Sequence, residues 1–272
     1  MTLHNNPEPK DESESEFERE NIHLPQMVEI PAGVFWMGTS KQQVMRLYEW
    51  EQWAQDWHRD GLFRGEQPQH KIELPAFEIA IYPVTNEEYR TFIWESGYKV
   101  PKGWLGFRYP EGLEKHPVVG VTKEDCEQFC DWLNKSSGIN FRLPTEAEWE
   151  KAARGPTPRV YPWGDEFDPW RCNTLESNKG GTTQVGSFSP AGDSPFGVAD
   201  MAGNVYEWTN SRLLPYPFQK NPPAPAPGES VRWILRGGAW YYSRKLARCA
   251  SREGVLQDNT SPALGFRVAR SL

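Results

Sequence analysis

Alternating apolar and polar positions mark the first strands of the chain. Residues 28–38 alternate in the manner of a strand, a turn and a second strand, and residues 72–81 alternate in the same way. Between them, residues 41–59 follow the period of a helix. The residues that recur at this helical spacing are Met45, Tyr48, Trp53 and Trp57. We therefore expect the structured domain to begin near Met27 and to carry an inserted amphipathic helix at about 41–59.

Three later helices are predicted from their first turns, each of which starts with a Thr followed three residues later by an acidic residue. The pairs are Thr85 with Glu88, Thr122 with Asp125, and Thr145 with Glu148. Where the acidic residue is Glu, the pair has the spacing of a capping box, in which each side chain accepts a hydrogen bond from the other residue's backbone N–H. The second helix carries an apolar stripe made of Cys126, Phe129, Cys130 and Leu133. Core packing therefore explains the cysteine pair.

Composition narrows the architecture that these elements build. The 272 residues are 38% hydrophobic and include 13 Trp, 23 Gly and 24 Pro. A chain of this size buries one large core, and many aromatic residues among many Gly and Pro favour short elements joined by long loops over a helical bundle. The Pro-rich run at 222–228 is expected to be a surface excursion, because strand-like residues 231–235 follow it at once.

Charge and the N-terminal residues limit the partners. A formal net charge of -7 lacks the basic surface that nucleic acid requires, so no nucleic-acid partner is expected. Residues 1–26 are acidic and polar, without the apolar core of a signal peptide, and are predicted to be a disordered leader. No apolar stretch is long enough to span a membrane, and the four cysteines have no disulfide or metal-ligand spacing. These features favour a cytoplasmic protein with buried free thiols.

Seven short motifs follow one another along the chain. They are Pro31–Gly38, Pro83–Tyr89, Arg142–Glu150, Tyr161–Gly164, Gly203–Trp208, Arg236–Trp240 and Gly265–Arg267. Together they resemble the sulfatase-modifying-factor family, which includes formylglycine-generating enzyme, over about residues 27–272. The resemblance implies an irregular α+β fold of the C-type-lectin-like kind, with little regular secondary structure, antiparallel strands, two main helices and long loops.

Three arginines, Arg248, Arg252 and Arg267, stand among apolar neighbours near the C-terminus. Two roles are open for them. Pairing with buried carboxylates is favoured, because the planar guanidinium matches a carboxylate with two parallel hydrogen bonds. Contact with a ligand is the alternative.

Residues 200–207 offer the oxygen donors that calcium prefers, since Asp200 and Glu207 supply carboxylates and the backbone between them supplies carbonyls. The resemblance implies a structural calcium ion bound by these two side chains and by the backbone of Gly203 and Val205. A plain turn held by an Asn side chain is the alternative. A second calcium site of the family falls on Asn173, Thr174, Ser177 and Lys179. Its third position holds Ser where the family has Asp.

The resemblance implies that the catalytic members bind copper(I) on two cysteines after the Arg-Gly-Gly motif and oxidise a substrate cysteine to formylglycine. The C-terminal segment of this chain departs from that pattern. Here Tyr242 stands in place of the first cysteine, no second one follows, and Cys249 aligns with a non-catalytic position. Copper(I) prefers soft thiolates, so no copper is expected. The five His are scattered and form no ligand set. An oxidoreductase of this type, or another modifying enzyme with an unidentified residue set, is the alternative function.

A scaffold that keeps a loop-bearing segment at about 236–270 suits recognition, because loops vary without unfolding the core. We therefore expect a non-enzymatic module, with an assembly subunit as a third interpretation. The expected ligand-binding residues are Tyr241, Tyr242, Ser243, Leu246, Ser251, Glu253, Gly254, Leu256, Gln257 and Asn259. Tyr provides contact area at low entropy cost, which favours a protein ligand. The layout resembles the variable proteins of diversity-generating retroelements, whose lectin-like domain ends in a diversified stretch.

Overall fold

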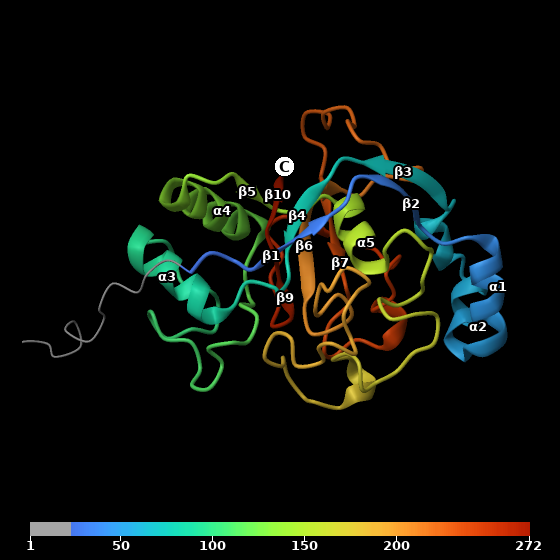
Figure 1. The fold of residues 1–272 in the computed structure, drawn as a ribbon, viewed down its shortest axis with the longest axis horizontal. Helices are drawn as coiled ribbons and strands as arrows, with labels where there is room; N and C mark the ends of the chain where they lie inside the picture. The colour runs from blue at the N-terminus through green and yellow to red at the C-terminus, as the bar shows by residue number, and fades with distance from the viewer. Residues whose placement is uncertain (1–22) are drawn as a thin grey trace, which may run out of the picture.

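The computed structural model describes residues 23–272 (Figure 1), and residues 1–22 of the predicted leader lie outside this range. Its first sheet is antiparallel and joins both ends of the described chain. In spatial order its strands are β1 (Met27–Ile30), β4 (Phe77–Ala80), β10 (Ala269–Ser271) and β5 (Phe141–Arg142). The C-terminal residues are therefore held in a sheet whose other strands come from three other parts of the sequence.

Two further sheets complete the strands of the described region. One is the hairpin of β2 (Gly33–Met37) and β3 (His70–Leu74). The other has the order β8 (Glu253–Leu256), β7 (Arg232–Arg236), β6 (Tyr206–Arg212) and β9 (Leu264–Gly265). Within it only β9 runs parallel to its neighbour β6. These sheets, with helices and long loops, confirm the predicted α+β class.

The three helices predicted from their first turns form where expected. They are α3 (Asn86–Ser96), α4 (Lys123–Ser137) and α5 (Glu146–Arg154). Each N-cap Thr accepts a hydrogen bond from the backbone N–H three residues on, and the acidic side chain there accepts one from the N-cap N–H. Because both halves of the box are local, the sequence alone was enough to place these helix starts.

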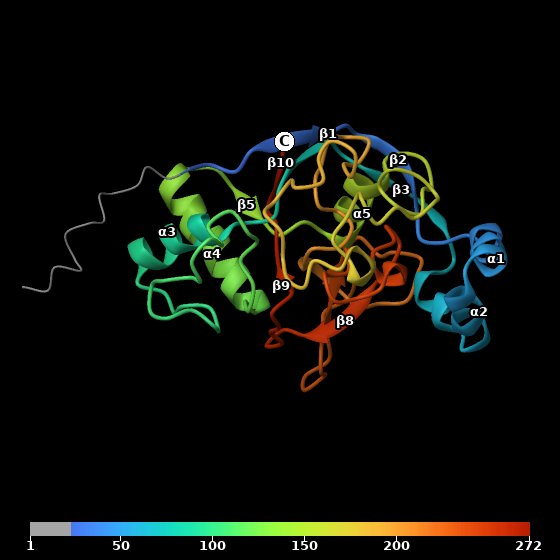
Figure 2. The same cartoon turned by 90° about the horizontal axis from the view of Figure 1, so that it is seen from below.

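The predicted single helix at 41–59 is instead two helices, α1 (Lys41–Trp50) and α2 (Gln52–Arg59), followed by the short η1 (Leu62–Glu66). Glu51 separates them with an extended backbone (φ -129, ψ 114). The break lets the rings of α2 and η1 turn inward around a buried arginine. In Figures 1 and 2 this insertion lies at the opposite end of the molecule from α3 and α4.

The largest apolar cluster lies between α3, α4 and the third sheet. Tyr89 stacks on Phe129 with ring centroids 5.8 Å apart, and Trp208 of β6 and Phe266 are fully buried in the same cluster. Helix α5 belongs to a second cluster, and all nine of its residues are buried. All four cysteines are buried and free, as predicted. Among residues 23–272, no helix has the length and apolar character needed to cross a membrane.

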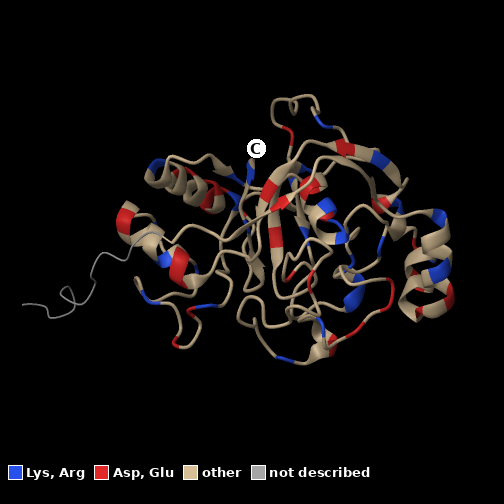
Figure 3. Cartoon of the chain, in the orientation of Figure 1, with Lys and Arg blue, Asp and Glu red and all other residues tan. Residues whose placement is uncertain are grey.

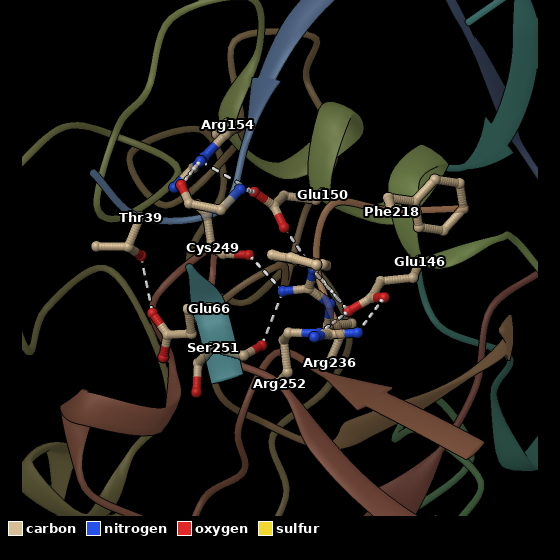
Figure 4. A network of polar contacts seen from close by, with 12 residues as sticks. Thr39, Glu66, Glu146, Glu150, Arg154, Phe218, Arg236, Cys249, Ser251 and Arg252 are labelled. Carbon is tan, nitrogen blue, oxygen red and sulfur yellow. Dashed lines mark hydrogen bonds and ion pairs between the residues drawn. The ribbon is translucent and has the colours of Figure 1, made fainter. Parts of the chain in front are cut away.

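Buried ion pairs connect the clusters, and they confirm the favoured role of the three arginines. Arg248 pairs with Glu66, Arg252 with Glu146, and Arg267 with Glu207. Figure 4 shows a fourth arginine, Arg236 of β7, between Glu146 and Glu150 of α5. Its other terminal nitrogen donates to the carbonyls of Cys249 and Ser251, at 2.9 and 2.8 Å. The base of the C-terminal segment is therefore fixed by charge as well as by strands.

Candidate ligand-binding face

The chain turns sharply out of β7 at two glycines. Gly237 and Gly238 have φ of 97° and 70°, which side chains rarely adopt. A Cβ on Gly238 would lie 2.9 Å from the backbone carbon and oxygen of Leu246, so the turn and the following segment press directly on each other. Only glycine fits here, and the turn delivers residues 240–246 to the surface.

Four aromatic rings meet at this turn. The Trp240 and Tyr241 centroids are 4.9 Å apart, Tyr241 and Tyr242 are 4.4 Å apart, and Tyr242 lies 5.4 Å from Tyr206 of β6. Partial burial, followed by the hydrogen bond with Tyr241, raises the pKa of Tyr242 to about 12. The Tyr206 hydroxyl is buried without a hydrogen-bond partner. We call Trp240, Tyr241, Tyr242 and Tyr206 the aromatic cluster.

Loops from elsewhere in the chain hold the short helix η3 (Arg244–Leu246) beside this cluster. The Arg244 backbone N–H donates to both carboxylate oxygens of Glu176, each at 3.0 Å, and its guanidinium pairs with Glu51 at the junction of α1 and α2. The Lys245 ammonium lies 5.8 Å from the Trp57 ring centroid. The insertion therefore borders this part of the face and extends it.

Arg248 holds the insertion against the C-terminal segment. Its two terminal nitrogens donate to the two carboxylate oxygens of Glu66, at 2.8 and 2.7 Å. The guanidinium carbon lies 5.2 Å from the ring centroids of Trp53 and Trp57 and 5.3 Å from that of Phe63. A desolvated cation among aromatic rings is attracted to them as well as to its carboxylate.

The predicted ligand-binding residues are only partly brought together. Successive positions along β8 alternate between the two faces of the sheet, so Glu253 and Val255 share one face and position 254 lies on the other. Glu253 is near enough to Tyr242 to contribute to its raised pKa, and Val255 packs on the main core with Tyr241 and Tyr242. A Cβ on Gly254 would lie 2.4 Å from the side chain of Leu213, on the opposite side.

The prediction is wrong for two residues of this set, Ser251 and Gly254. Ser251 is 1% exposed and Gly254 is buried, because strand pairing and the neighbouring loops cover them, so neither residue is accessible to a ligand. Tyr241, Tyr242, Ser243 and Leu246 lie together on the turn and η3, half-buried. Leu256, Gln257 and Asn259 are exposed beyond Glu253, toward the end of β8 and the loop after it.

A cavity of about 350 Å³ adjoins the aromatic cluster, and no sequence pattern predicted it. Its lining includes Trp104, Val119 and Pro262, and the indole N–H of Trp240 donates to the Pro262 carbonyl at 3.4 Å. Neither this cavity nor Tyr206 was predicted, because the loop at 101–120 and β6 meet the C-terminal segment only through the tertiary fold.

The proposed calcium loop has a different arrangement from the expected one. Glu207 does not fit as a ligand, because its carboxylate accepts hydrogen bonds from Arg267 on both oxygens, at 2.7 Å each, and from the Trp149 indole at 2.8 Å. Asn204 holds the turn, accepting from the backbone N–H of Thr183 and donating to the Thr183 carbonyl. The Asn204 side chain therefore bridges this turn to Thr183, and the calcium ion stays a prediction.

Asp200 is the remaining carboxylate of this loop. One of its oxygens accepts from the Gly186 backbone N–H at 2.6 Å, and burial raises its pKa to about 6. The backbone of Gly203 donates to the Gly237 carbonyl, which ties the loop to the glycine turn. Among residues 23–272, no three His, Cys, Asp or Glu side chains are grouped so that they could hold a metal ion. A calcium ion here would therefore depend on Asp200 and on the carbonyls of Gly203 and Val205.

The second expected calcium site fits less well. The Ser177 hydroxyl lies 2.7 Å from the Thr174 carbonyl and 3.2 Å from the side-chain oxygen of Asn173, and its one proton is shared between them, while its oxygen accepts from the Thr174 backbone N–H at 3.1 Å. It carries no negative charge of its own. Asn173 and Thr174 therefore belong to a turn that is already hydrogen-bonded.

The four cysteines are buried and free. Cys249 is fully buried, and burial raises the pKa of its thiol to about 12. Burial raises the pKa of Cys130 and Cys172 to about 12 as well, and that of Cys126 well above its ordinary value. Thiols in such surroundings stay protonated and inert.

Comparison with known proteins decides the family. The family model described as "Sulfatase-modifying factor enzyme 1-like domain" matches residues 12–272. The chain belongs to the sulfatase-modifying factor family. Among relatives of the domain, the inactive C-alpha-formylglycine-generating enzyme 2 of Mus musculus is 32% identical over 306 residues, with 91% of this chain and 86% of the relative covered.

Other relatives of this sulfatase-modifying factor domain are longer. A serine/threonine-protein kinase pkn1 of Chlamydia pneumoniae is 34% identical, and the match covers 77% of this chain and 35% of that protein. The chain thus spans about a third of the length of this relative.

Two solved structures share the fold of the domain. PvdO from Pseudomonas aeruginosa has a TM-score of 0.71 and 27% identity, covering 94% of this chain and 97% of that one. Treponema denticola variable protein 1 has a TM-score of 0.68 and 20% identity, covering 90% and 94%. The predicted C-type-lectin-like fold is confirmed by these likenesses.

Proposed function

We propose that this sulfatase-modifying factor domain is a non-enzymatic module that binds a protein ligand through its C-terminal segment. The observation that carries the proposal is the aromatic cluster, which stands at the position where the catalytic members are expected to hold copper. Tyr242 occupies that place, and its ring is packed between Tyr241 and Tyr206. Packed, half-exposed tyrosines lose little freedom on binding, which is the property that recognition surfaces use.

The chemistry of the thiols supports binding over oxidation. A copper(I) site needs thiolates, and the single cysteine of the C-terminal segment, Cys249, is buried with a raised pKa. One terminal nitrogen of the neighbouring Arg236 donates to the backbone of this segment, which is a structural task. The domain keeps the scaffold of the family while its C-terminal segment presents side chains suited to contact.

The kind of partner follows from the surface around the cluster. Basic and acidic residues are interspersed along the described helices and loops (Figure 3), and the net charge is -7. Such a surface does not offer the counterion release that drives binding to nucleic acid. Tyr and Trp beside an apolar cavity are typical of the centre of a protein interface. We therefore propose that the ligand is a protein and not a nucleic acid.

Diversification of the segment is a separate part of the proposal, supported by the layout between the Arg-Gly-Gly and Gly-Phe-Arg motifs and by the fold shared with a variable protein. It predicts a near-identical copy of the coding stretch for about 236–270 close to the gene, differing only at template adenines. Sequencing of the flanking region tests this. A region with neither the repeat nor a reverse transcriptase contradicts it.

A structural calcium ion is proposed at Asp200, with the backbone carbonyls of Gly203 and Val205 as further ligands. Burial disfavours the ionised form of Asp200, and a cation bound there would offset that cost. Glu207 is left out of the ligand set, since Arg267 and Trp149 occupy its carboxylate.

A protein array probed with the purified domain tests the binding proposal. The wild-type domain is expected to bind a small set of proteins, and the double variant Tyr241→Ala/Tyr242→Ala is expected to bind them at least about tenfold more weakly, since interface anchors each contribute above about 1 kcal/mol. Trp36→Ala is the matched control, because it truncates a partly exposed aromatic residue on β2, away from the cluster. Equal binding by the double variant contradicts the proposal.

A further inference from the structure

A second cavity, of about 520 Å³, lies under the Pro-rich excursion between β6 and β7. Figures 1 and 2 show this excursion as an orange loop that projects from the body of the domain. The cavity is lined by no residue of the aromatic cluster, and it shares Gln257 with the expected ligand-binding set.

The charged side chains that line this cavity are mainly basic. Three are cationic, namely Arg212, Lys220 and Arg252, and the acidic residue among the described lining residues is Glu146. Glu146 is already paired, because its oxygens bond with Arg252 and with the buried Arg236. The cavity thus carries a local positive charge, in a chain whose formal net charge is -7.

Apolar and aromatic groups form much of the remaining walls, together with uncharged polar residues such as Asn210, Ser211 and Gln219. Phe218 and several prolines come from the excursion, and Trp233 comes from β7. The Trp233 indole N–H is buried and has no hydrogen-bond partner. The same ring is contacted by Lys123, whose ammonium lies 3.7 Å from the ring centroid.

The excursion is pinned over the cavity at several points. Arg212 donates to the Pro223 carbonyl, and the Phe218 backbone N–H donates to the His70 ring at 2.8 Å. Proline fixes φ, so a loop rich in proline loses little further freedom when a ligand fills the space below it. The cavity is preformed to that extent.

We infer that this cavity binds a small anionic ligand with an apolar, aromatic body, in which a carboxylate or phosphate meets Arg212 and Lys220 and a ring packs among Phe218, Trp233 and the prolines. Arginine and lysine are the side chains that bind such groups, and apolar walls with a few placed polar groups are typical of small-molecule sites of this volume. The inference does not depend on the proposed protein-binding function.

Titration calorimetry and ligand-detected NMR with simple aryl compounds test it. Phenyl phosphate and benzoate are the anionic probes, benzamide is the neutral counterpart, and inorganic phosphate lacks the ring. We expect saturable 1:1 binding of an aryl anion, at least about tenfold tighter than the binding of benzamide and of inorganic phosphate. Whichever of the two anions binds more tightly identifies the headgroup.

The variants separate the cavity from general charge effects. Arg212→Gln/Lys220→Gln removes two cations from the cavity, and Lys41→Gln/Arg108→Gln makes the same charge change at exposed positions elsewhere. Because Arg212 also pins the loop, Gln257→Glu is a second variant, which adds a negative charge at the lining and leaves that bond alone. Both cavity variants are expected to lose binding at least about tenfold at an unchanged melting temperature, and the control pair is expected to keep it.

Three results would overturn the inference. One is the absence of saturable binding of either aryl anion up to about 10 mM. Another is equal binding of benzamide and benzoate, which would make the cavity merely apolar. The last is affinity that is unchanged in both cavity variants or reduced equally in the control pair, which would place the anion elsewhere.

Discussion

Single residues explain how the C-terminal segment is held in place. Arg248 is 1% exposed, and its guanidinium donates hydrogen bonds to Glu66. The side chains of Trp53, Trp57 and Phe63 surround it. The sequence predicted its pairing with a carboxylate, because arginines among apolar neighbours need a charge partner. It did not identify Glu66, which lies in the insertion, 182 positions away.

Removal of the Arg248 side chain should destabilise the domain strongly. Arg248→Met leaves the buried carboxylate of Glu66 unpaired, which typically costs about 3–5 kcal/mol. Urea unfolding followed by fluorescence measures the loss. The double variant Arg248→Met/Glu66→Gln removes both charges and should recover part of it; a double variant no more stable than the single one would show that the charge is not the cause.

The buried Asp200 carboxyl gives a pH dependence with a definite sign. Its pKa in the folded state is about 6, above the ordinary 3.8, so the folded state holds a proton that the unfolded state has already lost between these values. Its contribution is present below about pH 4 and is lost as the pH rises through 6, by about 3 kcal/mol in total. In EDTA, unfolding measured at both pH values should therefore show that wild type loses more stability than Asp200→Asn between about pH 4 and pH 7.

Calcium should reverse this loss if it binds as proposed. At about pH 7, replacing EDTA with calcium is expected to raise the melting temperature of the wild-type domain and to leave that of Asp200→Asn unchanged. Ser177→Ala is the control, because it alters the other expected site without touching Asp200. A wild-type melting temperature that is the same in EDTA and in calcium would contradict the proposed ion.

At the scale of elements, local signals predicted more than distant ones. The starts of α3, α4 and α5 follow from a Thr and an acidic residue three positions on, and both hydrogen bonds of each cap are local. The break between α1 and α2 was missed, since the helical period continues across Glu51, whose backbone is extended. Likewise, burial of Ser251 and Gly254 depends on strand pairing that no short pattern contains.

The glycine turn after β7 is the element that aims the binding segment. Gly238→Ala places a Cβ 2.9 Å from the Leu246 backbone at φ 70°, while Gly197→Ala has a similar φ of 77° and nothing within 4 Å. Strain at positive φ costs each variant about 1–2 kcal/mol. Gly238→Ala should lose at least about 1 kcal/mol more in chemical unfolding, because backbone must also move. Equal losses would mean that close packing of the turn on η3 is unimportant.

At the scale of the whole molecule, the domain combines a shared scaffold with a changed C-terminal segment. The buried pairs of Arg236 and Arg267, the capped helices and the three sheets hold that segment in place. The insertion borders it on one side, and the cavity beside Trp240 lies on the other. The family and the fold were predictable from ordered motifs, whereas the surface that these parts create together required the structure.

The central claim is that residues 240–246 present a contact surface and do not form the site of a copper-dependent oxidase. Oxygen consumption by the domain after incubation with copper(I), in the presence of a cysteine-containing peptide, tests this most directly. We predict no stoichiometric copper on the re-purified protein and no oxygen uptake above the rate of the peptide with free copper. One copper per chain, together with turnover that Cys249→Ala abolishes, would contradict the account.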